Sequence, residues 1–221
     1  MKLTVFGGTG RVGQHVLRQA VDAGHDITAV VRNPRKLTVE VRTVIADLNT
    51  PDPATIQSAI YGADAVLSGL GPQKRAENGI VSMGTRAIVE AMTRTGTRRL
   101  VVISGVGVAT IPVPDRPNPP TREPGAGLVM QYLSTPLTKV VLGEHLRDVA
   151  LMEYDLRKTD LDWTVMRIPY VVDKPLTGVY RTARGHALRR GLQIGRADAA
   201  HLMLTLAGQP QTVREVVTVG Y

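Results

Sequence analysis

The chain of 221 residues has no cysteine, few aromatic residues and no long hydrophobic run. The lack of cysteine excludes disulfides, a thiolate nucleophile and a cysteine-ligated metal site. No apolar run reaches the roughly 18 residues that a membrane-spanning helix needs. The first residues also lack the charged, apolar and small-residue blocks of a signal peptide. We therefore expect a soluble, cytoplasmic protein with no membrane partner.

Acidic residues are also in deficit, because 19 Asp and Glu face 27 Lys and Arg, which gives a net charge of +8. Such a balance can indicate a nucleic-acid partner. Here the basic residues are scattered, aromatic residues make up only 4% and no nucleic-acid motif occurs. We therefore expect no nucleic-acid partner and a surface that attracts anionic small molecules. The histidines show no metal-ligand spacing, so no metal site is expected.

The most informative segment is a glycine turn near the N-terminus. The apolar run 3–6 precedes the spacing G-x-x-G-x-x-G, and a helical pattern follows over 11–23. In a strand–turn–helix unit the glycines allow a tight turn, a close approach of backbone to a pyrophosphate and close packing of helix on strand. The helix N-terminus then offers its unpaired N–H groups to the anion. The expected pyrophosphate-binding residues are Gly7, Thr9, Gly10, Arg11, Val12 and Gly13.

The end of the second predicted strand indicates which dinucleotide binds. Residues 26–31 read as a buried parallel strand, after which an NAD-binding protein usually has an Asp or Glu for the ribose 2′-hydroxyl. This chain has Arg32 there, with Arg35 and Lys36 close behind. A guanidinium suits a 2′-phosphate through charge-assisted hydrogen bonds, so the residues favour NADP(H). The alternative is that Arg32 is a solvated surface charge.

Strand-like and helical runs alternate along the whole chain. This alternation predicts an α/β fold: a Rossmann-like, doubly wound parallel sheet with helices on both faces and small C-terminal elements on the substrate side. Without a linker or a repeat, residues 1–221 form one expected domain. Predicted strands are 3–6, 27–31, 41–46, 65–67, 100–104, 163–167 and 215–219, predicted helices are 11–23, 53–60, 78–95, 142–159 and 197–207, and residues 178–181 and 191–194 look extended.

Polar and glycine residues follow several of these strands at the edge where the cofactor is expected. Asp47 and Leu48 are expected near the adenine, and Gly69 and Gly71 near the ribose and pyrophosphate. Asp47 can alternatively be a turn or cap residue. Pro169, which follows the sixth strand, is also assigned to the cofactor site.

A proline-rich stretch over about 110–141 shows almost no periodicity. A long irregular segment in a compact domain is usually a functional lid or an insertion without a role. Because it follows the fifth predicted strand, we expect it to cover the substrate above the active site.

Several motifs together resemble the atypical short-chain dehydrogenases with an NAD(P)-binding domain. They are the glycine turn, the Arg-x-Pro after the second strand, and the stretch 163–169. Within this family the stretch 173–180 and the pattern Arg196-x-Asp198 are most similar to the biliverdin-IXβ reductases, also called flavin reductases. The resemblance implies NADPH-dependent hydride transfer to a flavin, quinone or related conjugated acceptor. It also implies that Ser104, after the fifth strand, lies beside the nicotinamide; a serine that bonds only backbone is the alternative.

The proton donor is the open part of this assignment. Tyr154 and Lys158 have the Tyr-x-x-x-Lys spacing common in short-chain dehydrogenases, but they lie too near the next strand and are interpreted as a helix face. Family members often carry a glutamate one turn after the catalytic lysine, and Glu153 fits it. This register places Val149 at the lysine position and His145 at the tyrosine position. The candidate catalytic residues are therefore Ser104, His145 and Glu153.

A second hypothesis follows from the missing tyrosine–lysine pair. The protein can be a non-catalytic NADP(H)-binding redox sensor that acts through a protein partner, with the proline-rich stretch as its interaction surface. An epimerase or isomerase fits less well, because it would need the tyrosine acid. The expected state is a monomer or a weak homodimer.

Overall fold

The computed structural model describes residues 1–72, 79–123, 125 and 135–221. Its centre is an eight-stranded sheet in the order β3-β2-β1-β4-β5-β6-β10-β8, in which only β8 runs antiparallel to its neighbour. The described strands are β1 Lys2–Phe6, β2 Asp26–Val31, β3 Arg42–Ile45, β4 Ala65–Ser68, β5 Arg99–Gly105, β6 Asp162–Ile168, β8 Arg181–Arg184 and β10 Glu215–Gly220, with β7 Tyr170–Val172 and β9 Gln193–Gly195 pairing separately.

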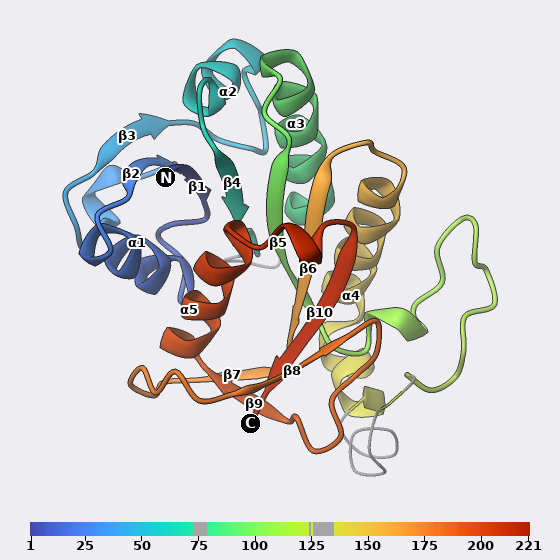
Figure 1. The fold of residues 1–221 in the computed structure, drawn as a ribbon. Coiled ribbons are helices and arrows are strands. Elements are labelled where there is room, and N and C mark those ends of the chain that lie inside the picture. Colours follow the sequence, from blue (N-terminus) through green and yellow to red (C-terminus); the bar gives the residue numbers. More distant parts are fainter. Residues whose placement is uncertain (73–78, 124, 126–134) are drawn as a thin grey trace.

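Helices cover both faces of the sheet (Figure 1). On one face α1 packs against α5, and on the other α2, α3 and α4 pack in succession. The described helices are α1 Gly13–Asp22, α2 Pro53–Ile60, α3 Ile80–Thr95, α4 Thr135–Arg157 and α5 Arg196–Ala207, with short 3-10 turns η1 Pro34–Lys36, η3 Val108–Thr110 and η5 Pro210–Thr212. The prediction of a Rossmann-like α/β fold is confirmed.

Strand β1 shows why the central strands read as continuous apolar runs. Leu3 and Val5 point into the core beneath α1 and α5, and Phe6 points into the core beneath α2, α3 and α4. Successive side chains of a strand alternate between faces, so a strand covered on both sides needs apolar residues throughout. Thr4 satisfies its buried hydroxyl by donating to the Ala59 carbonyl oxygen at 2.7 Å.

The strand order reverses at β1, which pairs with β2 on one side and with β4 on the other. The connections after β1 and after β3 therefore leave in opposite directions. In open parallel sheets, ligands bind outside the carboxyl ends of the strands at such a switch point. This places the glycine turn and the residues after β4 at the same position.

Three segments differ from the sequence expectation. Helix α4 begins at Thr135, so the irregular stretch predicted over about 110–141 ends sooner. Pro136 is compatible with a helix there, because the first-turn N–H that proline lacks has no intrahelical partner anyway. Strand β7 was not predicted, and β8 begins at Arg181, where the extended segment 178–181 was expected to end.

The segment between η3 and residue 123 has little regular structure. It contains one isolated antiparallel bridge, Val113 with Arg116, and extends away from the sheet (Figure 1). The end of the predicted stretch beyond Glu123, up to α4, lies largely outside the described residues. Its role as a cover over the active site stays a prediction.

Candidate cofactor and active site

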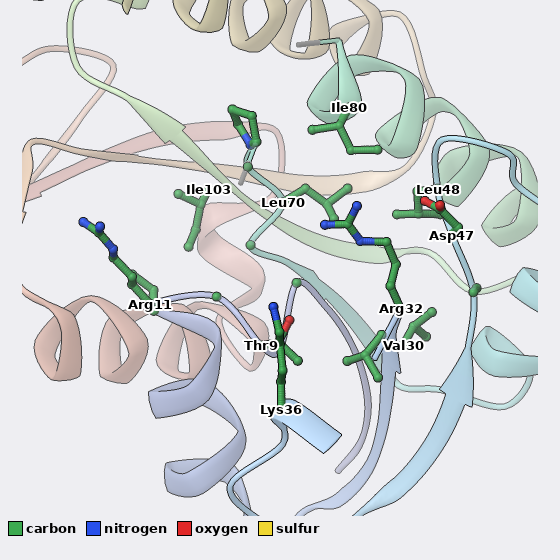
Figure 2. A pocket seen from close by; sticks show the side chains of 18 of the residues that line it. Thr9, Arg11, Val30, Arg32, Lys36, Asp47, Leu48, Leu70, Ile80 and Ile103 are labelled. Atoms are coloured by element: carbon green, nitrogen blue, oxygen red, sulfur yellow. The ribbon is translucent and has the colours of Figure 1, made fainter. Parts of the chain in front are cut away.

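A cleft of about 670 Å³ opens at the carboxyl edge of the sheet, at the switch point (Figure 2). Its walls come from the glycine turn, the end of β2, the residues after β3 and the residues after β4. Ten of the predicted cofactor residues line it: Gly7, Thr9, Gly10, Arg11, Val12, Arg32, Asp47, Leu48, Gly69 and Gly71. Four others, Gly13, Arg35, Ser104 and Pro169, are not among its lining residues, although Ile103 and Ile168, which precede Ser104 and Pro169, are.

The glycine turn is a cradle in which side chains would not fit. Gly7 has φ +76°, and a Cβ there would lie 2.5 Å from the Gly69 carbonyl oxygen. A Cβ on Gly13 would lie 2.1 Å from the Gly7 carbonyl oxygen, which is why α1 can approach the end of β1 so closely. The Gly10 N–H donates to the same oxygen at 2.9 Å and closes the turn. The close approach of backbone that a dinucleotide pyrophosphate needs is therefore present.

Three basic side chains surround the cleft from three elements (Figure 2). Arg11 lies within the glycine turn, Arg32 follows β2 and Lys36 ends η1, and all three line the cleft. Arg35 does not, and its backbone N–H instead donates to the Asn33 side chain at 3.0 Å. An anionic ligand in this cleft would meet positive charge at two separate places, near the turn and near the end of β2.

Asp47 is a turn residue that also lines the cleft. Its Oδ1 accepts hydrogen bonds from the Asn49 backbone N–H at 3.0 Å and from the Asn49 side-chain amide at 2.7 Å, as in an Asx turn. Asp47 also lines the cleft, next to the buried Leu48. The turn thus holds Asp47 in the wall of the cleft, and its place beside an adenine stays a prediction.

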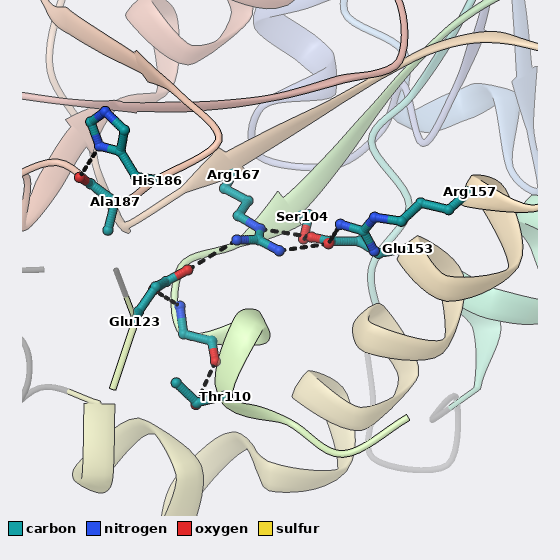
Figure 3. Close-up of polar contacts among 9 residues, drawn as sticks. Ser104, Thr110, Glu123, Glu153, Arg157, Arg167, His186 and Ala187 are labelled. Atoms are coloured by element: carbon teal, nitrogen blue, oxygen red, sulfur yellow. Dashed lines mark hydrogen bonds and ion pairs between the residues drawn. The ribbon is translucent and has the colours of Figure 1, made fainter. Parts of the chain in front are cut away.

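Ser104, the residue after Ile103 in β5, belongs to a buried ionic network (Figure 3). The Ser104 hydroxyl donates to Oε1 of Glu153 at 2.6 Å. Arg167 donates from Nε to the same oxygen at 2.9 Å and from Nη2 to Glu153 Oε2 at 2.7 Å. All three residues are at least 94% buried. The half-exposed Arg157 adds a contact to Glu153 Oε2 at 2.7 Å.

A second carboxylate, Glu123, ties the segment after η3 to this network. Its Oε1 accepts from Arg167 Nη1 at 3.1 Å and its Oε2 accepts from the Gly107 N–H at 2.6 Å. Burial raises the pKa of Glu123, and Arg167 and the Gly107 N–H oppose that effect. Burial acts on Glu153 in the same direction, but the ion pairs and hydrogen bonds with Arg167, the charge of Arg157 and the hydrogen bond from Ser104 outweigh it and lower the pKa of Glu153.

Ser104 and Glu153 are therefore brought together, whereas His145 is not part of their network. Burial lowers the pKa of His145, an effect that Asp148 only partly opposes, so its imidazole is neutral at pH 7. Asp148 itself caps α3 by accepting the N–H groups of Val81 and Ser82, both at 2.9 Å. Val149, at the position of the family's lysine, is buried in the core. Tyr154, near the end of α4, contacts Lys158, which lies just beyond that helix.

A residue outside the predicted site fixes the segment between β7 and β8. Asp198, in the first turn of α5, accepts from the Thr177 N–H at 2.9 Å, the Thr177 hydroxyl at 2.7 Å and the Gly178 N–H at 2.9 Å. The Tyr221 hydroxyl donates to it at 2.6 Å. Burial would raise the pKa of Asp198, but these hydrogen bonds lower it.

Arg167 and Glu123 were missed as site residues, but one of them has a sequence signal. Arg167 lies among the mostly apolar residues of β6, and a buried arginine needs carboxylate partners. Among the described residues, no group of three or more potential metal ligands occurs and no helix is long and apolar enough to cross a membrane.

Comparisons with known proteins agree with this geometry. The uncharacterized protein YwnB of Bacillus subtilis is 26% identical over 99% of this chain and 98% of its own length. A short-chain dehydrogenase/reductase of Veillonella parvula, solved in complex with NADP, superposes with a TM-score of 0.77 at 17% identity, covering all of this chain and 94% of that one. ChuY, an anaerobillin reductase of Escherichia coli O157:H7, superposes with a TM-score of 0.75 at 20% identity, covering 99% and 96%.

The two superpositions show a shared fold. The assignment to a family comes from the sequence, since the model of the NAD(P)H-binding family matches residues 7–210. That match contains the glycine turn, the end of β2 and the strand ends that form the cleft. The chain therefore belongs to the NAD(P)H-binding family, with the fold of the short-chain dehydrogenases.

Proposed function

We propose that this protein is an NADPH-dependent oxidoreductase that reduces a flavin, a quinone or a similar conjugated acceptor. One observation supports the cofactor assignment above all: the cleft that contains the glycine turn also contains Arg32 and Lys36. Two cations at the end of β2, where NAD-binding proteins usually have a carboxylate, match a ribose 2′-phosphate. The pyrophosphate would lie against the glycine turn, with Arg11 beside it.

When bound, NADPH supplies a hydride to the acceptor and leaves as NADP⁺, and the reduced acceptor takes its proton from solvent. The protein's own task is then to hold two rings against each other and exclude competing reactions. The polar groups nearest the end of β5 suit an acceptor that needs no proton from the protein. The Ser104 hydroxyl donates its hydrogen bond to Glu153, and Arg167 holds Glu153 as an anion. Conjugated acceptors spread the added charge over a ring system, unlike a simple ketone.

The test is NADPH consumption by the purified protein with FMN, a quinone, a tetrapyrrole and a simple ketone as separate acceptors. We expect steady oxidation with at least one conjugated acceptor and little with the ketone. Turnover of the ketone alone would contradict the proposed acceptor class.

A substitution tests the cofactor preference. Replacing Arg32 with Glu removes a charge-assisted contact worth about 1.5–3 kcal/mol and adds repulsion, so NADPH affinity should fall by roughly tenfold or more. Arg35→Glu makes the same change of charge three residues away, outside the cleft lining, and should weaken NADPH binding much less. Fluorescence titration with NADPH and NADH measures both. Equal loss in the two variants would mean that Arg32 acts only through long-range charge.

A non-catalytic NADP(H) sensor is the second candidate. This candidate is favoured because His145 and Val149 stand where the family has its tyrosine and lysine. The sensor would use the segment between η3 and Glu123 to bind a protein. Tight NADPH binding without consumption of NADPH in the acceptor screen would favour it. A cytoplasmic location is part of either proposal, because both depend on a supply of NADPH, and cell fractionation tests it.

A further inference from the structure

The hydroxyl of Ser104 has one proton, and the network fixes where it goes. Its oxygen lies 2.6 Å from Glu153 Oε1. An ionised carboxylate only accepts hydrogen bonds, so the serine must be the donor in this contact. The hydroxyl oxygen then keeps acceptor capacity for a further partner but has no second proton to donate.

Glu153 is held in the ionised form that this orientation requires. Arg167 binds both of its oxygens, at 2.9 and 2.7 Å, and is itself fixed by Glu123 at 3.1 Å. Glu153 is 1% exposed and Arg167 is 6% exposed, so water does not compete for these contacts. Paired donors from a planar guanidinium also fix the plane of the carboxylate, and with it the position of Oε1.

We propose that Glu153 and Arg167 are positioning residues that make Ser104 a hydrogen-bond acceptor toward the nicotinamide, where it selects the amino group of the carboxamide. The inference rests on the proposed binding of NADP(H). Ser104 directly follows Ile103, which forms part of the cleft wall, and is the next-to-last residue of β5. A carboxamide offers one donor group and one acceptor group, and a serine locked by Glu153 can pair only with the donor.

A cofactor analogue separates this arrangement from the opposite one. In the 3-acetylpyridine analogue of NADP⁺ an acetyl group replaces the carboxamide, so the carbonyl acceptor remains and the amino donor is lost. If Ser104 accepts, the wild-type protein should bind NADP⁺ about three- to tenfold more tightly than the analogue, the range of one ordinary hydrogen bond. If Ser104 instead donates to the carbonyl oxygen, which both nucleotides carry, the protein should bind NADP⁺ and the analogue equally tightly.

Two variants connect the preference to the network. Ser104→Ala should reduce the affinity ratio of NADP⁺ to analogue to nearly one, and its methyl group leaves the Glu153–Arg167 pair intact. In Glu153→Gln the amide can turn its NH₂ toward Ser104, which frees the serine proton for the cleft, so the ratio should fall as well. Thr164→Val, in β6, is the matched control and should leave the ratio unchanged. It also removes a buried hydroxyl, which donates to the Thr212 carbonyl oxygen at 2.6 Å.

The measurement is the dissociation constant of each nucleotide by calorimetry. Because the pKa of Glu153 is lowered, the wild-type ratio should stay constant from pH 5 to pH 9. A wild-type ratio near one, a ratio that survives in Ser104→Ala, or a ratio that survives in Glu153→Gln overturns the inference. Should Glu153→Gln not fold, the wild-type and Ser104→Ala ratios decide it. No binding of NADP⁺ to the wild-type protein would instead refute the proposed cofactor.

Discussion

Gly13→Ala is the substitution that tests the glycine cradle most severely. The new Cβ would lie 2.1 Å from the Gly7 carbonyl oxygen and 2.9 Å from the Gly8 Cα, which are both backbone atoms. Real Cβ atoms essentially never come within 3.0 Å of such atoms, so α1 and the turn must separate by about 0.9 Å. Overpacking of this kind costs about 1–3 kcal/mol. At about 2–4 °C per kcal/mol for a chain of this size, Tm should fall by roughly 2–12 °C.

Gly13→Ala should cost more free energy in NADPH binding than in folding, because the backbone N–H groups that it displaces are those expected to meet the pyrophosphate. Differential scanning fluorimetry with and without NADPH measures both effects in one assay. Gly208→Ala is the matched control: its Cβ would approach only the Thr205 carbonyl oxygen, at 4.0 Å, and the residue lies at the far end of α5. There Tm should stay constant or rise slightly. A Gly13→Ala protein with wild-type Tm and wild-type stabilisation by NADPH would refute the cradle.

Two further predictions concern buried carboxylates. Asp198→Asn places an amide NH₂ against donors from Thr177, Gly178 and Tyr221, so the free energy of unfolding should fall by about 1–3 kcal/mol. A protease should then cut the segment between β7 and β8 faster. An unchanged cleavage rate would contradict the proposed role of Asp198. The raised pKa of Glu123 means that the folded state disfavours ionisation of this carboxyl. The contribution of Glu123 to stability is therefore greatest below its ordinary pKa of about 4.5, and it is lost as the pH rises through the raised pKa. The Tm of wild type relative to Glu123→Gln should therefore fall from pH 4 to pH 7, and a constant difference would show that burial does not perturb Glu123.

The sheet was predictable because its strands are buried on both faces. Residues 100–104 read as an apolar run since Leu100 and Val102 pack under one helical layer and Val101 under the other. The glycine turn was equally readable, because only glycine tolerates the contacts at Gly7 and Gly13. Strand β7 carries no such pattern, since it has only three residues and none of them is fully buried.

The ionic network behind the cleft was not predictable in the same way. Glu123 and Arg167 are 44 residues apart, and Ser104 and Glu153 are 49 apart. Such pairs depend on where β5, β6 and α4 meet, which no local pattern contains. Sequence reasoning placed Ser104 and Glu153 among the candidate catalytic residues, but the direction of the hydrogen bond between them appears only in three dimensions. His145 was grouped with them because the family register places it at the tyrosine position. Asp148, three residues further along α4, binds the N-terminus of α3 instead.

The central claim is that the cleft binds NADPH and passes its hydride to a conjugated acceptor. The most direct measurement mixes the purified protein with NADPH and FMN without oxygen and follows the absorbance of both. We predict that the reduced nicotinamide and the oxidised flavin disappear together, one for one, and that NADH in place of NADPH reacts more slowly. An unchanged flavin signal, with a quinone equally unreduced, in the presence of bound NADPH would contradict the account.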